Sequence, residues 1–168
     1  MEGEERYEKN VKNGLSKEWY RNGRLKKEGS YKEGLVALRL YRKKCIKRVV
    51  DHHLYCGIAE KHGVWKEWYE NGNLKKEENY KDHSREGVWK EWNENGQLWY
   101  EGSYALDLKD GVWKVYHENG QLAFEGSYKL GKPNGVWKEW DENGKLKREG
   151  YYESNKQVWQ KWDEVGNP

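Results

Sequence analysis

The residues best suited to bind a metal are two cysteines and three histidines in the first half of the chain. They are Cys45, His52, His53, Cys56 and His62. Thiolate and imidazole groups are the usual ligands of zinc, but the spacing C-x6-H-H-x2-C does not match the short ligand pairs of common zinc sites. Two cysteines are also too few for a disulfide framework. We therefore expect no metal site and no cofactor, with zinc left open as an alternative.

Carboxylates are the other groups that could do chemistry, as acid–base pairs. The chain has 29 Asp and Glu residues, but many recur at fixed intervals together with lysines, which favours ion pairing over catalysis. The sequence has no G-x-S-x-G nucleophile motif, no phosphate-binding loop and no H-E-x-x-H zinc motif. We therefore predict that the protein is not an enzyme.

The recurring carboxylates belong to a tandem repeat of 24 residues. The motif Gly-Val-Trp begins at Gly63, Gly87, Gly111 and Gly135. With the glycine as position 0, each copy has Trp at +2, Lys at +3, an aromatic residue at +5, Asn-Gly at +8 and +9, Leu at +11, Glu at +14 and Tyr at +17. Such self-similarity predicts a repeat architecture in which each unit contacts only its neighbours.

The repeat frame extends in both directions and leaves no stretch for a second domain, so we predict one domain over residues 1–168. An earlier copy begins at Gly14, and partial copies lie around Tyr7 and from Val158 to Gly166. Residues 38–62 fit the frame as a diverged copy that has lost its Asn-Gly turn and gained one residue.

Each repeat is predicted to form a β-hairpin. Asn-Gly between two aromatic-rich runs is a strong hairpin signal, because a two-residue type I′ turn needs a positive φ at both central residues. In that register Lys at +3 faces Glu at +14 and Trp at +2 faces Gly at +15, as in Lys114–Glu125 and Trp113–Gly126. An indole resting on a cross-strand glycine covers exposed backbone. A longer loop with a bulge would shift these pairs.

Alternation of side chains along the strands predicts what each face of the sheet carries. We expect Trp at +2, Leu at +11 and Tyr at +17 on one face, and Val at +1, Lys at +3, the aromatic residue at +5 and Glu at +14 on the other. The predicted fold is all-β: an elongated, single-layer, twisted antiparallel sheet of tandem hairpins. Its apolar burial must come from rings, since the chain has 11 Trp and 13 Tyr but few aliphatic residues.

Charge and hydropathy along the chain bear on its location. No segment has the roughly 18 apolar residues that a transmembrane helix needs. The first residues, Met1-Glu-Gly-Glu-Glu-Arg6, are charged and lack the apolar core of a secretory signal. The expected location is therefore the cytoplasm, where the two cysteines would stay reduced.

The string G-V-W-K-E-W-x-E-N-G-x-L-x-x-E-x-x-Y occurs almost intact at Gly63–Tyr80, Gly87–Tyr104, Gly111–Tyr128 and Gly135–Tyr152. It resembles the MORN repeat, and most of all the bacterial variant found in antitoxin-like and cell-envelope-associated proteins. The resemblance implies a β-hairpin scaffold that binds proteins or, in some eukaryotic members, lipids. It brings no catalytic residues to carry over to this chain.

The first predicted interface is basic and lies in the diverged copy. Between Gly34 and Ile58 the six cations outnumber a single acidic residue, Asp51, and aliphatic residues lie beside them. The cations are Arg39, Arg42, Lys43, Lys44, Lys47 and Arg48. A strand or short helix of this composition would dock on an acidic partner. The alternative is a drifted repeat whose charges are merely solvated.

The second predicted interface is aromatic and follows the row at +5, because Trp and Tyr dominate binding hot spots. Its members include Trp68, Trp92, Tyr116 and Trp140. In the centre of the array Trp99 and Phe124 replace lysines, so Trp92, Trp99, Tyr116 and Phe124 would form a less charged patch, although the register places them on two faces. The alternative is that these rings only cover backbone.

These features predict contact with another protein. The favoured hypothesis is a non-catalytic scaffold that inhibits a toxin, nuclease or other effector by covering its surface, as a bacterial or phage antitoxin or immunity protein would. The alternatives are nucleic-acid binding or association with an anionic membrane, both through the basic segment 39–48. Unpaired terminal strands leave self-association open as well.

Overall fold

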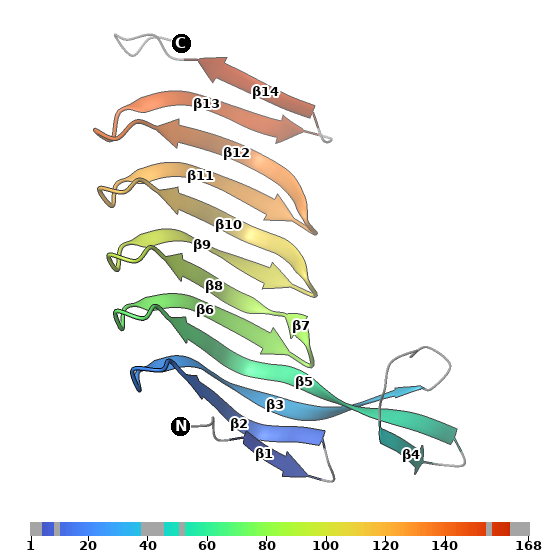
Figure 1. Cartoon of the computed structure of the whole chain (residues 1–168). Helices are drawn as coiled ribbons and strands as arrows, with labels where there is room; N and C mark the ends of the chain where they lie inside the picture. Colours follow the sequence, from blue (N-terminus) through green and yellow to red (C-terminus); the bar gives the residue numbers. More distant parts are fainter. Residues whose placement is uncertain (1–4, 9–10, 38–45, 51–52, 154–155, 162–168) are drawn as a thin grey trace.

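The computed structural model describes residues 5–8, 11–37, 46–50, 53–153 and 156–161. These residues form one 14-stranded antiparallel sheet without a helix (Figure 1). Five tandem hairpins make up most of it: β2 (Val11–Trp19) with β3 (Leu25–Ala37), β5 (His53–Trp68) with β6 (Leu74–Lys81), β8 (Gly87–Trp92) with β9 (Leu98–Ala105), β10 (Leu108–Tyr116) with β11 (Leu122–Lys129), and β12 (Lys132–Trp140) with β13 (Leu146–Glu153). Strands β1 (Glu5–Glu8) and β14 (Lys156–Lys161) pair with the two ends of the series, and β7 (Ser84–Arg85) pairs with β6. The predicted sheet of tandem hairpins is confirmed.

The backbone register within the hairpins is the predicted one. Lys at +3 lies opposite Glu at +14, and Gly at 0 opposite Tyr at +17, in every hairpin of the series. In the fourth hairpin, Lys114 is the partner of Glu125, and Trp113 that of Gly126. The charge pairing in the sequence therefore predicted the strand register correctly.

The Asn-Gly turn is not the predicted type I′ turn. In the fourth hairpin the Gly120 N–H donates to the His117 carbonyl at 2.9 Å, and the His117 N–H donates to the Gln121 carbonyl at 2.8 Å. Gly120 has a φ of 84°, whereas Asn119 is not among the residues with a positive φ. The loop is therefore a three-residue type I turn followed by a glycine bulge.

A second bulge cancels the register change that this longer loop introduces. Next to the turn, Tyr116 at +5 lies opposite Leu122 at +11, one residue out of the predicted register. The register then shifts between Val115 and Tyr116, which leaves Ala123 at +12 without a cross-strand partner and restores the predicted pairs beyond it. Because cross-strand partners share a face, Leu at +11 lies with the aromatic residue at +5. The predicted position of this leucine beside Trp at +2 is wrong.

Two-residue turns with a positive φ at both positions do occur, but they connect one hairpin to the next. They are Asp82-His83, Leu106-Asp107 and Leu130-Gly131. Leu106 and Leu130 have φ values of 50° and 51°. A bulky L residue in this left-handed region is strained by roughly 1–2 kcal/mol.

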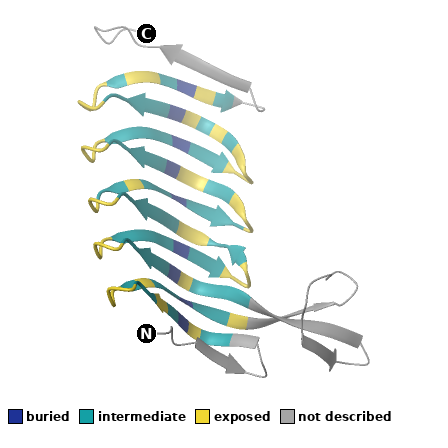
Figure 2. Ribbon diagram, viewed as in Figure 1, coloured by how far each residue is buried: buried dark blue, intermediate teal, exposed yellow. Residues whose placement is uncertain are grey.

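The core is a narrow column along the middle of the strands (Figure 2). Trp65, Trp113 and Trp137 are only 2%, 7% and 5% exposed. A Cβ added to Gly29, Gly102 or Gly126 would lie 2.1, 2.2 or 2.4 Å from the ring of Trp65, Trp113 or Trp137, respectively. The prediction placed each indole on the glycine of its own hairpin. These three indoles rest instead on the glycine of the preceding hairpin. The contact ties the second, fourth and fifth hairpins to the hairpins before them.

Residues 38–62, predicted as a diverged copy of the repeat, are described only at 46–50 and 53–62, so that copy stays a prediction. Strand β3 pairs directly with β5 in the sheet. The outer halves of β3 and β5 extend beyond the other strands, where β4 (Ile46–Val50) pairs with β5 (Figure 1). The segment has neither the Asn-Gly turn nor the Gly-Val-Trp motif of the other copies before Gly63. A single domain over residues 1–168 stays a prediction.

Candidate functional site

The two faces of the sheet offer different surfaces to a partner. The indole face carries Trp at +2 and Tyr at +17, and the ladder face carries Val at +1, Lys at +3, the aromatic residue at +5, Leu at +11 and Glu at +14. On the indole face the rings contact one another. The ring centroid of Trp113, for example, lies 5.1 Å from that of Tyr104 and 6.2 Å from that of Tyr128.

Cations of the chain itself cover many of the rings on the indole face. Lys109 Nζ lies 4.1 Å from the Trp113 ring centroid and 4.9 Å from that of Tyr128. Lys61 has the equivalent position above Trp65 and Tyr80. Burial lowers the pKa of both lysines. Since cation–π contacts already occupy these rings, the indole face has fewer ring surfaces free for a partner.

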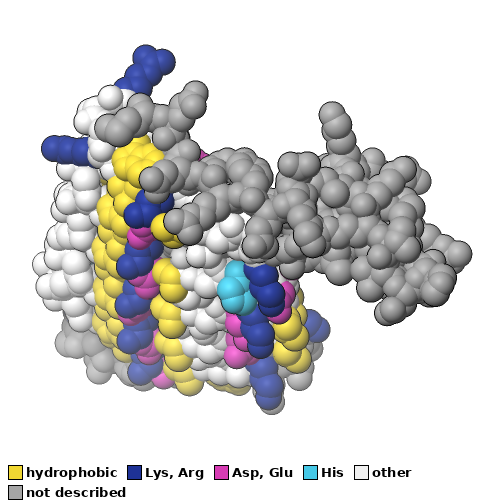
Figure 3. Space-filling view, turned by 90° about the horizontal axis from the view of Figure 1, so that it is seen from below, with side chains coloured by type: hydrophobic (Ala, Val, Ile, Leu, Met, Phe, Trp, Pro, Cys, Tyr) yellow, Lys and Arg dark blue, Asp and Glu magenta, His cyan; other side chains and the backbone are white. Residues whose placement is uncertain are grey.

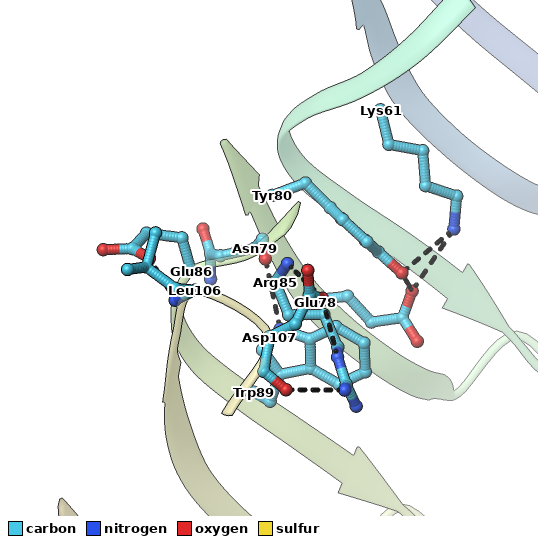
Figure 4. A network of polar contacts seen from close by, with 9 residues as sticks. All are labelled: Lys61, Glu78, Asn79, Tyr80, Arg85, Glu86, Trp89, Leu106 and Asp107. Carbon is cyan, nitrogen blue, oxygen red and sulfur yellow. Dashed lines mark hydrogen bonds and ion pairs between the residues drawn. The ribbon is translucent and has the colours of Figure 1, made fainter. Parts of the chain in front are cut away.

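The second hairpin departs from the glycine pattern of the indole face. Glu78 stands where the other hairpins have glycine, and Trp89 is therefore only half-buried. The Glu78 carboxylate accepts a hydrogen bond from the Tyr80 hydroxyl (3.1 Å) and pairs with Lys61 Nζ at 3.7 Å (Figure 4). Burial, and then Glu78, raises the pKa of Tyr80. The Glu78 carboxylate, the Tyr80 hydroxyl and the Lys61 ammonium group thus interact with one another. This carboxylate therefore stabilises the structure and is not free for acid–base chemistry.

A row of alternating charges runs along the ladder face (Figure 3). Within the hairpins, Lys at +3 and Glu at +14 form ion pairs of 3.0–3.5 Å. The glutamates of the first four hairpins also lie opposite the lysine of the next hairpin, as Glu125 does opposite Lys138. Such exposed pairs contribute only about 0.2–1 kcal/mol each. Because lysines and glutamates alternate, the row has no continuous positive potential. It therefore does not attract a polyanion such as nucleic acid along its length.

An apolar row runs beside these charges. The side chains at +1 are Leu15, Val64, Val88, Val112 and Val136, and they are 47–51% exposed. Aliphatic side chains that line up in this way form a contiguous exposed patch, which marks interaction surfaces on soluble domains. The ladder face therefore combines an apolar row with hydrogen-bonding groups on one flat sheet.

The aromatic row at +5 lies on the other side of the ladder and is half-buried. Tyr116 is held there by its hydroxyl, which donates to Glu101 Oε1 at 2.8 Å. Burial, and then this bond, raises the pKa of Tyr116 to about 12. The predicted interface residues Trp68, Trp92 and Trp140 share this row, packed against the leucines at +11. Their role in binding stays a prediction.

The loop edge of the sheet is built by the asparagine at +8 of the repeat. The Asn71 Oδ1 accepts the Asn73 backbone N–H at 2.8 Å, and its Nδ2 donates to the Glu94 carbonyl of the next loop at 2.7 Å. The residue at +6 adds a second link, as when the Tyr69 hydroxyl donates to the Trp92 carbonyl at 2.9 Å. These bonds stack the loops rigidly on one another.

A hollow of about 450 Å³ interrupts this edge between the third and fifth hairpins. It is lined by Asn93, Trp99, Tyr116, His117, Glu118 and Glu142. At +6 the third hairpin has Asn93, which turns inward and accepts the Gln97 backbone N–H at 2.9 Å. An asparagine is too short to fill the space that a tyrosine fills in the first two hairpins. Trp99, half exposed, borders the resulting opening.

The predicted aromatic patch is divided by the sheet. Trp99 and Tyr116 line the hollow together, whereas Phe124 lies on the indole face, where its ring centroid is 5.1 Å from that of Trp137. Four residues of the hollow were not predicted from the sequence: Asn93, His117, Glu118 and Glu142. The available signal was the residue at +6, which changes from Tyr to Asn, His and Asp along the array.

The predicted basic interface falls mostly on residues that the structure does not describe. Arg39, Arg42, Lys43 and Lys44 lie outside the described residues, as do Cys45 and His52. Lys47 and Arg48 belong to β4, and His53 and Cys56 belong to β5. For these four residues the structure describes the strand pairing but not the side chains. Within the part of the chain that is described, no group of three or more His, Cys, Asp or Glu residues could hold a metal ion. The basic interface and its nucleic-acid and membrane alternatives stay predictions.

Comparison with known proteins agrees with this geometry. Among the described residues there is no helix of the length and apolarity that crossing a membrane requires. No curated protein was found to match the sequence. A family model described as MORN repeat variant matches residues 12–33, 61–82, 85–105, 109–130 and 133–154, and each match falls on one of the five hairpins. Because these matches cover more than half of the chain, the protein belongs to the MORN repeat variant family, whose repeats form scaffolds for binding.

Proposed function

We propose that this chain is a non-catalytic protein-binding scaffold, and that it inhibits an effector protein in the manner of an antitoxin by covering part of its surface. The observation that carries the proposal is the ladder face, where exposed aliphatic side chains at +1 lie beside a row of charges of alternating sign. The first supplies apolar area and the second supplies donors and acceptors at regular spacing. Together they match the mixed composition of non-obligate protein interfaces.

The rigidity of the array supports the same function. Indoles on glycines tie three of the hairpins to the ones before them, and stacked loop hydrogen bonds hold one edge. A preorganised surface loses little conformational entropy on binding, so more of the contact energy appears as affinity. The net charge of +3 is small for 61 charged groups, so long-range attraction to nucleic acid does not explain the ladder face.

The experiment is capture of a partner from an extract of the host, followed by an activity assay with the purified pair. Two variants separate the ladder face from the rest of the surface. Val88→Lys with Val112→Lys places two cations in the apolar row, and Leu106→Lys makes the same kind of change at an exposed loop tip off this face. We expect a stoichiometric partner whose activity falls on binding. The double variant should lose capture and the loop variant should retain it.

Two results would contradict the proposal. One is the absence of a stoichiometric partner under conditions where the chain is folded. The other is a partner that binds the Val88→Lys, Val112→Lys variant as well as it binds the wild type. A partner that binds but keeps its full activity would refute the inhibitory part of the proposal. The protein-binding part would stand.

A further inference from the structure

The hollow between the third and fifth hairpins lacks a cation that the first two hairpins supply themselves. In the first hairpin, Lys26 Nζ at +12 lies 5.9 Å from the ring centroid of Tyr20 at +6. In the second, Lys75 Nζ lies 5.4 Å from the ring centroid of Tyr69. The same two positions in the third hairpin hold Trp99 and Asn93. In the third hairpin a tryptophan therefore replaces the lysine at +12, and an asparagine replaces the tyrosine at +6.

The lining of this hollow is aromatic and acidic. Trp99 is 50% exposed, and Tyr116 of the next hairpin lines the same hollow. Glu118 and Glu142 come from two successive loops and form no ion pair with another described residue. The ladder lysines of the same hairpins are engaged elsewhere, Lys114 with Glu125 at 3.4 Å and Lys138 with Glu149 at 3.1 Å. The hollow thus combines ring surfaces with negative charge that no cation of the described residues pairs with.

We propose that this hollow binds an arginine side chain from a basic segment of the partner protein. The inference rests on the proposed binding function and assigns it a specific contact. An arginine guanidinium stacks flat on an indole and donates in a fork to carboxylates, so it uses both parts of the lining at once. The two exposed carboxylates repel phosphate and acidic peptides, whereas they attract a cation.

The loops around the hollow favour a preformed site. His117 Nε2 lies 3.0 Å from the Trp140 carbonyl, which fixes the fourth loop against the fifth hairpin. Asn119 Nδ2 donates to the Glu142 backbone carbonyl and so sets the spacing of the loops that carry the two glutamates. A guanidinium would therefore enter a space whose walls are already held in place.

The test is an NMR titration of the full chain with a short acetylated, amidated peptide that contains two adjacent arginines. The matched probe is the same peptide with citrulline, which keeps the shape and removes the charge. The Trp99 indole N–H signal is assigned by its absence in Trp99→Lys. We expect saturable shifts of this signal with the arginine peptide and none with the citrulline peptide.

Variants make the test specific for the hollow. Trp99→Lys restores the lysine of the first two hairpins and supplies a cation from the chain itself. It should weaken peptide binding at least about fivefold, as expected for loss of the ring and addition of a like charge. Leu106→Lys adds the same charge at another loop and should change the affinity less than about twofold. Glu118→Gln with Glu142→Gln keeps the rings, tests the carboxylates separately and should also weaken binding.

Several outcomes would overturn the inference: no shift at millimolar peptide, equal shifts with citrulline, or equal affinities of Trp99→Lys and Leu106→Lys. If Trp99→Lys fails to fold, the variant Glu118→Gln with Glu142→Gln tests the site by itself. An unchanged affinity of that variant for the arginine peptide would refute the site. The broader function is judged by partner capture and its dependence on Val88 and Val112. Its failure is therefore distinguishable from failure of the arginine site.

Discussion

Replacement of Gly126 by alanine tests whether the indoles make the core. The backbone of Gly126 is extended, so alanine is conformationally acceptable there and by itself would stabilise the strand by about 0.5–1 kcal/mol. Its Cβ, however, would lie 2.4 Å from Trp137 Cδ2, closer than the 3.0 Å below which real Cβ contacts essentially do not occur. The ring has to move out of its buried position, and overpacking of this kind costs about 1–3 kcal/mol. We expect a net loss of about 1–2 kcal/mol.

A double-mutant cycle isolates the ring as the cause. Trp137→Leu removes the clash and itself lowers stability, by about 2–3 kcal/mol. In that background Gly126→Ala should be neutral or stabilising, so the coupling between the two positions should be about 1.5–3 kcal/mol. Because arrays of repeats can unfold in parts, hydrogen exchange of amides in β11 and β12 is the appropriate measurement, with urea unfolding followed by fluorescence and circular dichroism. An unchanged or more stable Gly126→Ala protein, or a cycle with no coupling, would refute this account of the core.

Three further predictions follow from the turns and from the ladder face. Asn119→Asp loses the donor to the Glu142 carbonyl but keeps the oxygen that accepts the Gln121 N–H, whereas Asn119→Gly loses both, so the glycine variant should be the less stable; urea midpoints of the two variants decide, and the reverse order would favour a type I′ turn. Leu130→Asn should raise the free energy of unfolding by up to about 1 kcal/mol, since asparagine tolerates the left-handed region, whereas Leu108→Asn at an ordinary φ should bring no gain. Burial and the bond to Glu101 raise the pKa of Tyr116 to about 12, above its value of about 10 in the unfolded chain. The neutral phenol therefore stabilises the fold fully below pH of about 10, and the stability difference between the wild type and Tyr116→Phe should shrink as the pH rises toward 12; a constant difference would contradict the assignment.

The sequence predicted the sheet and its register because both depend on contacts that repeat with the same period. Lys114 and Glu125 recur as a pair in every copy, and a pairing that is wrong by one residue would put like charges together and rings on the wrong face. The same periodicity could not reveal which glycine an indole covers. Trp137 has Gly126 on one side and Gly150 on the other as backbone partners, and only the direction of its side chain selects the preceding hairpin.

The turn type and the face of the leucine at +11 could not be predicted for a related reason. Asn-Gly is compatible with a type I′ turn and with a type I turn followed by a glycine bulge, and the choice lies in the side chain of the asparagine. Asn119 bonds both to the Gln121 N–H and to the next loop, which the bulged turn permits. The longer loop then demands a compensating bulge at +12, and that bulge moves Leu122 to the ladder face.

Position +12 explains how this fold can acquire a specific site without losing stability. Because the bulge leaves this residue without a cross-strand partner, the strand register does not depend on its identity. The position accordingly changes from Lys26 and Lys75 to Trp99 and Ala123 along the array. At +6 the side chain bridges to the next loop, and Asn93 gives up that bridge and opens a hollow beside Trp99. Specificity in such a scaffold should therefore be sought first where a repeat departs from its neighbours at +6 and +12, since the rest of the repeat is committed to holding the sheet together.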